Sequence, residues 1–223
     1  MNYELLLNNN VELWGKVKGD LQFSHTVVGE NFYEFLLEVP RLSESSDIIP
    51  ITISEKLFTK DSIKENDLIS IAGQFRSYNK LIDNKSKLML TVFVREILPL
   101  DTSKNPNIIS LKGFLCKEPI FRTTPFKREI CDILLAVNRA YNKSDYLPCI
   151  IWGRNARFVK NLPVGTKLSL SGRIQSRVYQ KKLSEDEVVN KTAYEISISK
   201  VDVIEKEPIT TLELNKLKQS VNE

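Results

Sequence analysis

The sequence contains little of what a metal centre or a disulfide framework requires. It has one histidine, His25, and three scattered cysteines (Cys116, Cys131 and Cys149) with no C-x-x-C pair. Zinc sites need closely spaced Cys and His clusters, and isolated cysteines are typical of reduced thiols in a cytosolic protein. We therefore expect no metal ion, no cofactor and no disulfide.

Long apolar runs are also missing. No segment approaches the roughly 18 apolar residues of a membrane span, and the opening MNYELLLNNN lacks the basic start and apolar middle of a secretory signal. The composition, 42% hydrophobic and 27% charged, is typical of soluble globular proteins. We expect a cytoplasmic protein without membrane contact, long enough at 223 residues for two domains.

The charge is unevenly distributed along the chain. Residues 1–105 carry 12 Lys and Arg against 15 Asp and Glu, whereas residues 106–204 carry 17 against 9. The polar stretch LPLDTSKNPN, with two prolines, separates the halves and predicts a linker at 101–107. A basic half favours a polyanionic partner, although a solvated basic surface without any partner would give the same composition.

The two halves are divergent copies of one unit. Residues 35–54 align without a gap with residues 133–152 at an offset of 98, and residues 68–77 align with residues 167–176 at an offset of 99. Matches in the same order at a nearly constant offset indicate a duplication. This predicts an N-terminal module at 1–100, a C-terminal module at 108–204 and a tail at 205–223.

Each copy predicts three strands, a short helix and two further strands. In the second copy the strands are expected at 108–117, 130–139, 146–152, 167–179 and 192–203. In RNARFVKNL, Ala156, Val159 and Leu162 share one helical face. This is the element order of the OB fold, a small five-stranded barrel, and Gly113 and Gly172 within strands predict sharp bends or bulges. The expected fold is all-β with short helices, in two tandem OB-fold modules.

Strand alternation predicts which side chains face outward. Leu168, Leu170 and Ile174 share the core parity, so Arg173 and Arg177 should lie on the outer face. In the strand at 146–152 both sets are apolar, and parity leaves open whether Trp152 is buried at a strand end or exposed.

The first copy provides a control for Trp152. It has Ser54 at the matching position, Ile48 where the second copy has Tyr146, and Lys56 for Arg154, while the core leucines and isoleucines stay apolar. An aromatic residue that one copy lacks without losing its core is favoured as a functional surface residue. Unpaired bases stack on such rings while Lys and Arg follow the phosphates, an arrangement that duplex DNA cannot use because pairing hides the base faces.

The second copy resembles the bacterial single-stranded DNA-binding proteins. The resemblance covers nearly all of residues 108–204, in the family's order and spacing, and rests on KEPIFRTTP, LAVNR, YLPCIIWGRNARFV and GTKLSLSGRIQSRVY. It implies base-stacking positions at Trp152, Tyr146, Tyr179 and Tyr141. It also implies phosphate contacts from Arg122, Arg139, Arg173, Arg177, Lys181 and Lys182. The comparison of the two copies adds Arg154.

The resemblance implies sequence-tolerant binding of single-stranded DNA, with RNA left open, in replication, recombination or repair at the bacterial nucleoid. Family members usually end in an acidic tip that recruits enzymes, and ITTLELNKLKQSVNE has none. Most members carry one module and form tetramers, so a two-module chain would reach four modules as a dimer.

An OB-fold protein of this kind could also have one of two other functions. The chain could be an accessory, primosome-type replication protein that uses its modules mainly for protein assembly and binds nucleic acid weakly. It could also be an OB-fold nuclease, but phosphodiester hydrolysis needs metal-binding carboxylates or an activated water. The acids of the second copy are single or lie in the loop SEDE, so we expect no enzymatic activity.

Overall fold

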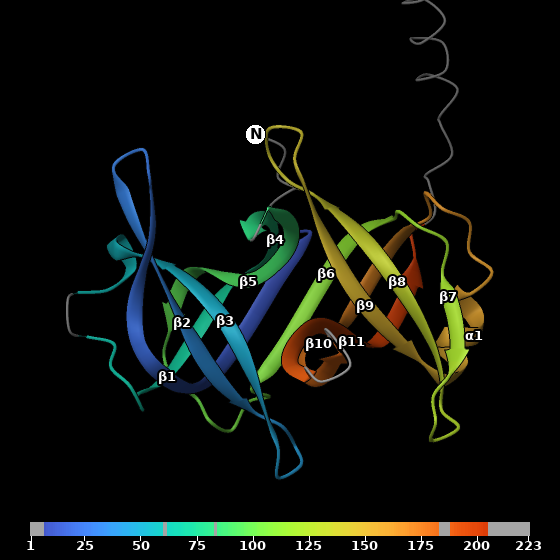
Figure 1. The fold of residues 1–223 in the computed structure, drawn as a ribbon, viewed down its shortest axis with the longest axis horizontal. Coiled ribbons are helices and arrows are strands. Elements are labelled where there is room, and N and C mark those ends of the chain that lie inside the picture. Colours follow the sequence, from blue (N-terminus) through green and yellow to red (C-terminus); the bar gives the residue numbers. More distant parts are fainter. Residues whose placement is uncertain (1–6, 60–61, 83, 183–187, 205–223) are drawn as a thin grey trace, which may run out of the picture.

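The computed structural model describes residues 7–59, 62–82, 84–182 and 188–204. Module one contains β1 (Asn9–Val27), β2 (Glu30–Pro40), β3 (Ser46–Ser54), the 3-10 turn η2 (Glu55–Leu57), β4 (Leu68–Ile82) and β5 (Lys85–Leu98). Module two contains β6 (Asn107–Leu115), β7 (Ile120–Thr123), β8 (Glu129–Asn138), β9 (Ser144–Trp152), α1 (Gly153–Val159), β10 (Lys167–Lys182) and β11 (Val188–Val203). Figure 1 shows the two modules side by side.

Each module is a closed five-stranded barrel. The strand order is β2-β3-β5-β4-β1 in module one, closed by β1–β2, and β6-β10-β11-β9-β8 in module two, closed by β6–β8. The pairs β3–β5 and β9–β11 are parallel, and the other ladders are antiparallel. The predicted fold class, two tandem OB folds with a short helix after the third strand, is confirmed.

Gly172 has the predicted geometric role, whereas no register shift accompanies Gly113 in β6. The β10–β11 register shifts between Ser171 and Gly172, and a Cβ on Gly172 would collide with the carbonyl oxygen of Ser197. Gly73 in β4 is under the same restriction against Phe93. A side chain is excluded where one strand crosses so closely over another, so both barrels need glycine at this bend.

One difference from the predicted elements is the short strand β7. The equivalent part of module one belongs to the single long strand β1, which passes a register shift between Lys18 and Gln22. In module two Pro119 occupies this place and has no N–H to donate to a ladder. The strand therefore breaks into β6 and β7.

The core settles the question that parity left open in β9. Asp145, Leu147, Cys149 and Ile151 are buried, so Trp152 belongs to the outward set. The predicted core residues Leu168, Leu170 and Ile174 are also buried. The helix α1 packs through Ala156 and Val159, two of the three residues expected on its inner face. No helix in the described ranges is long and apolar enough to cross a membrane.

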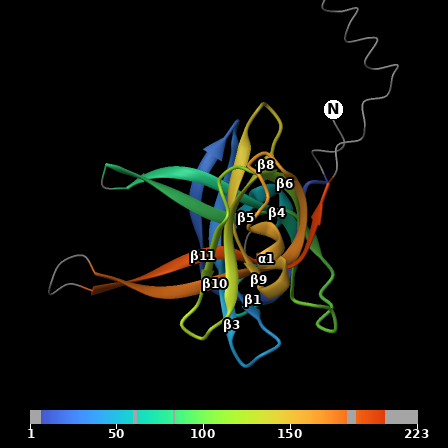
Figure 2. The same ribbon diagram turned by 90° about the vertical axis from the view of Figure 1, so that its right-hand side faces the viewer.

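The modules join through an antiparallel ladder between β1 and β6. Its central pair is Val11 with Ile109, which are each other's counterparts at an offset of 98, and Asn9 pairs with Leu111 as Leu13 pairs with Asn107. The junction is therefore an approximate two-fold within one chain. The β4–β5 and β10–β11 hairpins extend to the same side of the molecule (Figure 2) and line a common groove of about 720 Å³.

Candidate nucleic-acid interface

Trp152 lies at the end of β9 on the outer face of module two. The ring is half-buried, and its indole N–H donates to Ser197 Oγ over 3.0 Å. It lines a cleft of about 430 Å³ together with Asn155 and Arg173. Because its only polar group is already bound, Trp152 offers a neighbouring molecule its apolar ring rather than a hydrogen bond.

The three predicted tyrosines are exposed but dispersed. Tyr146 shares the outward face of β9 with Trp152 and is 47% exposed; six residues of strand separate them by about 20 Å. Tyr141 is 93% exposed in the turn after β8, where its φ of 60° is left-handed. Tyr179 is on β10, with the Arg177 guanidinium 5.7 Å from its ring centroid. The aromatic positions are distributed over β9, β10 and the turn after β8, and no two of their rings are in contact in the described residues.

Several of the predicted cationic side chains are accessible to solvent. Arg154 is exposed on α1, the segment that directly follows Trp152. Arg122 on β7 pairs with Asp132, an ion pair that is well exposed, and Arg177 lies 3.9 Å from Glu195. Lys181 and Lys182 belong to β10, but their side chains lie outside the described residues.

Arg139 and Arg173 have a different setting, at the junction between the modules. Arg173 Nη1 is 2.9 Å from Oδ2 of the buried Asp47, which also holds Arg41. We name Asp47, Arg41 and Arg173 the Asp47 cluster. In the same way Arg139 Nη1 is 3.2 Å from the buried Asp145, which also holds Arg76 at 3.2 Å. We name Asp145, Arg76 and Arg139 the Asp145 cluster.

Backbone contacts lock both clusters across the junction. Asp47 Oδ1 accepts the Ser176 N–H and Asp145 Oδ1 accepts the Ser77 N–H, each over 2.8 Å. The serine hydroxyl oxygens in turn accept N–H groups of β3 and β9, from Ile48 at 2.9 Å and Tyr146 at 2.7 Å. Each carboxylate thus faces two guanidiniums, and each cluster retains one positive charge.

The two clusters differ in their electrostatics. The hydrogen bond from Arg41 to Asp47 raises the pKa of Arg41. By contrast, burial and the neighbouring Arg139 lower the pKa of Arg76. Burial is the larger cause, so the two clusters differ mainly in how far their arginines are removed from water, and Asp145 partly offsets the effect on Arg76.

The junction role of these arginines was missed by sequence reasoning. The signal was present, because Arg41 and Asp47 recur as Arg139 and Asp145 with identical spacing. A repeated Arg-Asp pair can mark a structural ion pair as well as a ligand contact. From the sequence, Arg139 and Arg173 were predicted only as phosphate contacts.

Part of the chain is similar to a known family of proteins. Residues 106–204 match the Single-strand binding protein family. Single-stranded DNA-binding protein 1 of Staphylococcus aureus (strain COL) is 36% identical over 81 residues, which cover 33% of this chain and 48% of the relative. The chain therefore spans about half the length of the curated relatives it matches.

The wild-type single-stranded DNA binding protein from Thermus aquaticus has a similar structure, with a TM-score of 0.68 and 19% identity. The match covers 90% of this chain and 94% of that one, so it includes both modules. The chain is a two-module OB-fold protein similar to bacterial single-stranded DNA-binding proteins. A match to the N-terminal domain of PriB from Thermoanaerobacter tencongensis is 47% identical over 41% of this chain, but its TM-score of 0.35 carries no structural argument.

The region matched to the family contains every predicted site residue, from Arg122 to Lys182. It also contains Cys131 and Cys149, which are buried in the barrel and form no disulfide. Among the described residues, no group of three or more potential metal ligands gathers.

Proposed function

We propose that module two binds single-stranded DNA with little sequence preference. Bases stack on Trp152, Tyr146, Tyr179 and Tyr141, and phosphates contact Arg154, Arg122, Arg177, Lys181 and Lys182. Arg139 and Arg173 contribute from the junction clusters, where each cluster keeps one positive charge. The protein would serve replication, recombination or repair as a binding protein, with no chemical step of its own.

The outward position of Trp152 supports this function most strongly. Its ring lies on the outer face of β9, its N–H is already used by Ser197, and Arg154 follows two residues later. A flat apolar ring beside exposed guanidiniums matches an unpaired base beside its phosphate. Stacking does not depend on base identity, which is why we propose a sequence-tolerant binder.

Fluorescence titration tests the proposal. Trp14 of module one, whose indole N–H donates to Lys104 O, is first replaced in Trp14→Phe so that Trp152 is the only reporter. Addition of oligo-dT is expected to quench Trp152, and the observed log K should fall with log[salt] by about 0.7 per phosphate neutralised. Trp152→Ala should weaken binding by about 1–3 kcal/mol.

The control is Phe158→Ala, which removes a half-exposed ring of α1 and should leave the affinity unchanged. Equal affinity for duplex DNA, or no quenching together with wild-type affinity of Trp152→Ala, would overturn the stacking mechanism. We also propose that two chains associate to present four modules. A stable monomer in sedimentation of the full-length protein would contradict that assembly.

A further inference from the structure

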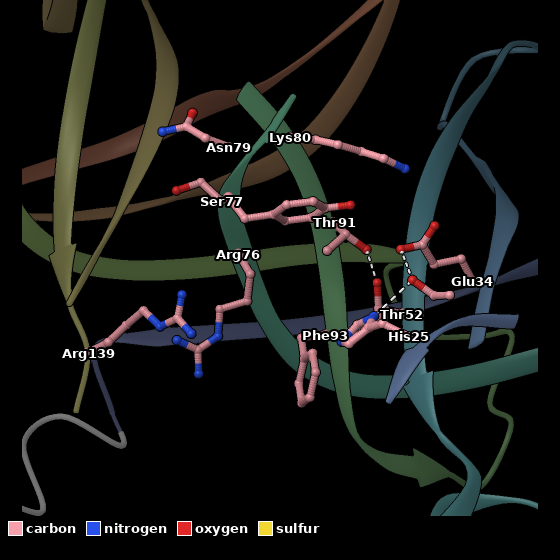
Figure 3. A pocket seen from close by; sticks show the side chains of 12 residues that line it. His25, Glu34, Thr52, Arg76, Ser77, Asn79, Lys80, Thr91, Phe93 and Arg139 are labelled. Atoms are coloured by element: carbon pink, nitrogen blue, oxygen red, sulfur yellow. Dashed lines mark hydrogen bonds between the residues drawn. The ribbon is translucent and has the colours of Figure 1, made fainter. Parts of the chain in front are cut away.

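A pocket of about 460 Å³ is lined mainly by residues of module one. Its lining comes from the strands β1, β2, β3, β4 and β5, with Arg139 added from module two. Figure 3 shows the Arg76 and Arg139 guanidiniums side by side at one end, with Phe93 and His25 close together. Aromatic rings and cations therefore occur together on the module that lacks Trp152.

The aromatic residue has changed strand between the two copies. In module one Thr52 of β3 faces Phe93 of β5, and in module two Ile150 of β9 faces Ser197 of β11. Thr52 and Ile150 are counterparts at an offset of 98, so Phe93 is the counterpart of Ser197. Module two has Trp152 packed beside Ser197, whereas module one has Ser54 with Phe93 on the neighbouring strand.

Phe93 is held like a stacking platform. It is half-buried, and its ring packs on the buried Phe32 with centroids 5.5 Å apart. The exposed His25 stacks on the same Phe32 at 5.1 Å with nearly parallel planes. The Arg95 guanidinium lies 5.7 Å from the Phe93 centroid. The ring thus packs on Phe32 and lies under the exposed Arg95 side chain, and an incoming base would stack on it by displacing that side chain.

The charge of the pocket favours an anion. Asp145 neutralises only one of its two arginines, and Lys80 on β4 adds an exposed ammonium. The acid that faces these groups in the lining is Glu34, whose Oε1 accepts the Ser24 hydroxyl at 2.6 Å. With Arg76 and Arg139 only 17% and 33% exposed, the positive charge sits in a partly desolvated wall, where an anion is attracted more strongly than in water.

We propose that this pocket is a second nucleotide-binding site, in which a base of single-stranded DNA stacks on Phe93, one adjoining phosphate is bound by Arg76 and Arg139, and Lys80, at the opposite end of the pocket, contacts the next phosphate (Figure 3). The inference rests on the proposed function and extends it to the module that has no tryptophan platform. The site is shared, because its Arg139 comes from module two. A strand that leaves Tyr179 can reach it along the groove between the hairpins, whose lining includes both Tyr179 and Tyr78.

The test uses full-length protein carrying Trp152→Ala, which weakens module two, and fluorescein-labelled oligo-dT. Adding Phe93→Leu keeps apolar volume over Phe32 but removes the aromatic face, and is expected to lower the remaining affinity roughly 5- to 150-fold. Phe158→Ala in the same background is the matched control and should have no effect. Thermal unfolding of each variant shows whether the fold is retained.

A second variant does not depend on packing. Lys80→Gln removes an exposed cation that the proposal assigns to a phosphate, and the magnitude of the salt slope should fall by about 0.7 for this lost contact. Lys112→Gln, on an exposed position of β6, is the control. Photocrosslinking with oligonucleotides that contain 5-iododeoxyuridine should label the peptides of Phe93 or His25.

The outcomes separate the two proposals. If the wild-type protein does not bind oligo-dT at all, the proposed function itself is refuted. The second site alone would be overturned if Trp152→Ala weakens binding but Phe93→Leu leaves the residual affinity unchanged. In that case Lys80→Gln would also leave the salt slope unchanged, and crosslinks would be confined to module two. Residual binding that Phe93→Leu weakens and that crosslinks to module one would support the second site.

Discussion

Replacing Asp145 by asparagine tests whether the junction clusters hold the two modules together. Asp145 has a fully buried side chain and receives Arg139 from its own module, together with Arg76 and the Ser77 N–H from module one. The substitution Asp145→Asn would keep the shape of the side chain and one acceptor for Ser77. It would remove the charge that both guanidiniums face, and those guanidiniums would then repel each other.

The expected loss of stability is large. Removing one partner of a buried ion pair costs about 3–5 kcal/mol, because the remaining charge is left without compensation. Arg139 is one-third exposed and regains some hydration, so we expect the lower end, about 3 kcal/mol for Asp145→Asn. The matched control is Asp132→Asn, which breaks the exposed pair with Arg122 and should cost at most about 1 kcal/mol.

Urea unfolding followed by far-UV circular dichroism and by tryptophan fluorescence measures the difference. Trp152→Phe and Trp14→Phe backgrounds leave one tryptophan each, in module one and module two respectively, so that the two modules can be followed separately. The wild type is expected to unfold in one transition, and Asp145→Asn in two, with earlier loss of contact between modules. A cost for Asp145→Asn no larger than that of Asp132→Asn would refute the reasoning, as would an unchanged single transition.

Two further predictions concern the interior. Burial raises the pKa of the Cys131 thiol to about 11 and also raises that of Cys149, so both thiols stay protonated at pH 8. They should react with Ellman's reagent far more slowly than the partly exposed Cys116 until urea unfolds the protein. Because the folded state favours the protonated thiols, the free energy of unfolding should be unaffected below pH 9 and should fall as the pH rises towards 11. Rapid reaction of all three native thiols would contradict this. Gly172→Ala should destabilise the protein by clearly more than the ordinary ~1 kcal/mol of a point substitution, because the new Cβ would collide with the Ser197 carbonyl. The neighbouring Ser171→Ala is the control and should not cause such a loss. Equal melting temperatures of the two variants would show that the bend tolerates a side chain.

The fold could be predicted because its signals are local and repeated. The strand order, the helix through Ala156 and Val159, and the bend at Gly172 were all readable from alternation, spacing and glycine position. The break between β6 and β7 was not predicted, although Pro119 is visible in the sequence. Its effect depends on whether the N–H at that place takes part in a ladder, which only the paired strand reveals.

The candidate site was less predictable for two physical reasons. The role of Arg139 and Arg173 depends on which module lies next to them, and the similarity between the two modules does not show how they dock. Phe93 was not predicted as a site residue, because the offset between equivalent residues of the two copies grows from 98 in β3 to 104 in β5, as the ladder partners show. A comparison at constant offset cannot align Phe93 with Ser197.

Carrying both modules in one chain frees each half of the junction to change separately. In a homodimer a two-fold axis imposes the same residue at both equivalent positions. Here β4 reads Gln74 and Arg76 where β10 has Arg173 and Gln175, yet each arginine reaches the aspartate of the opposite module.

The exchange keeps the ion pair but changes what surrounds it. Arg76 becomes more buried than Arg173, with 17% against 37% of the side chain exposed, and is placed in the pocket beside Phe93. The same contacts that fix the modules thereby place a positive charge next to a relocated aromatic ring. In module one, therefore, one arginine belongs both to the contact between the modules and to the proposed binding pocket.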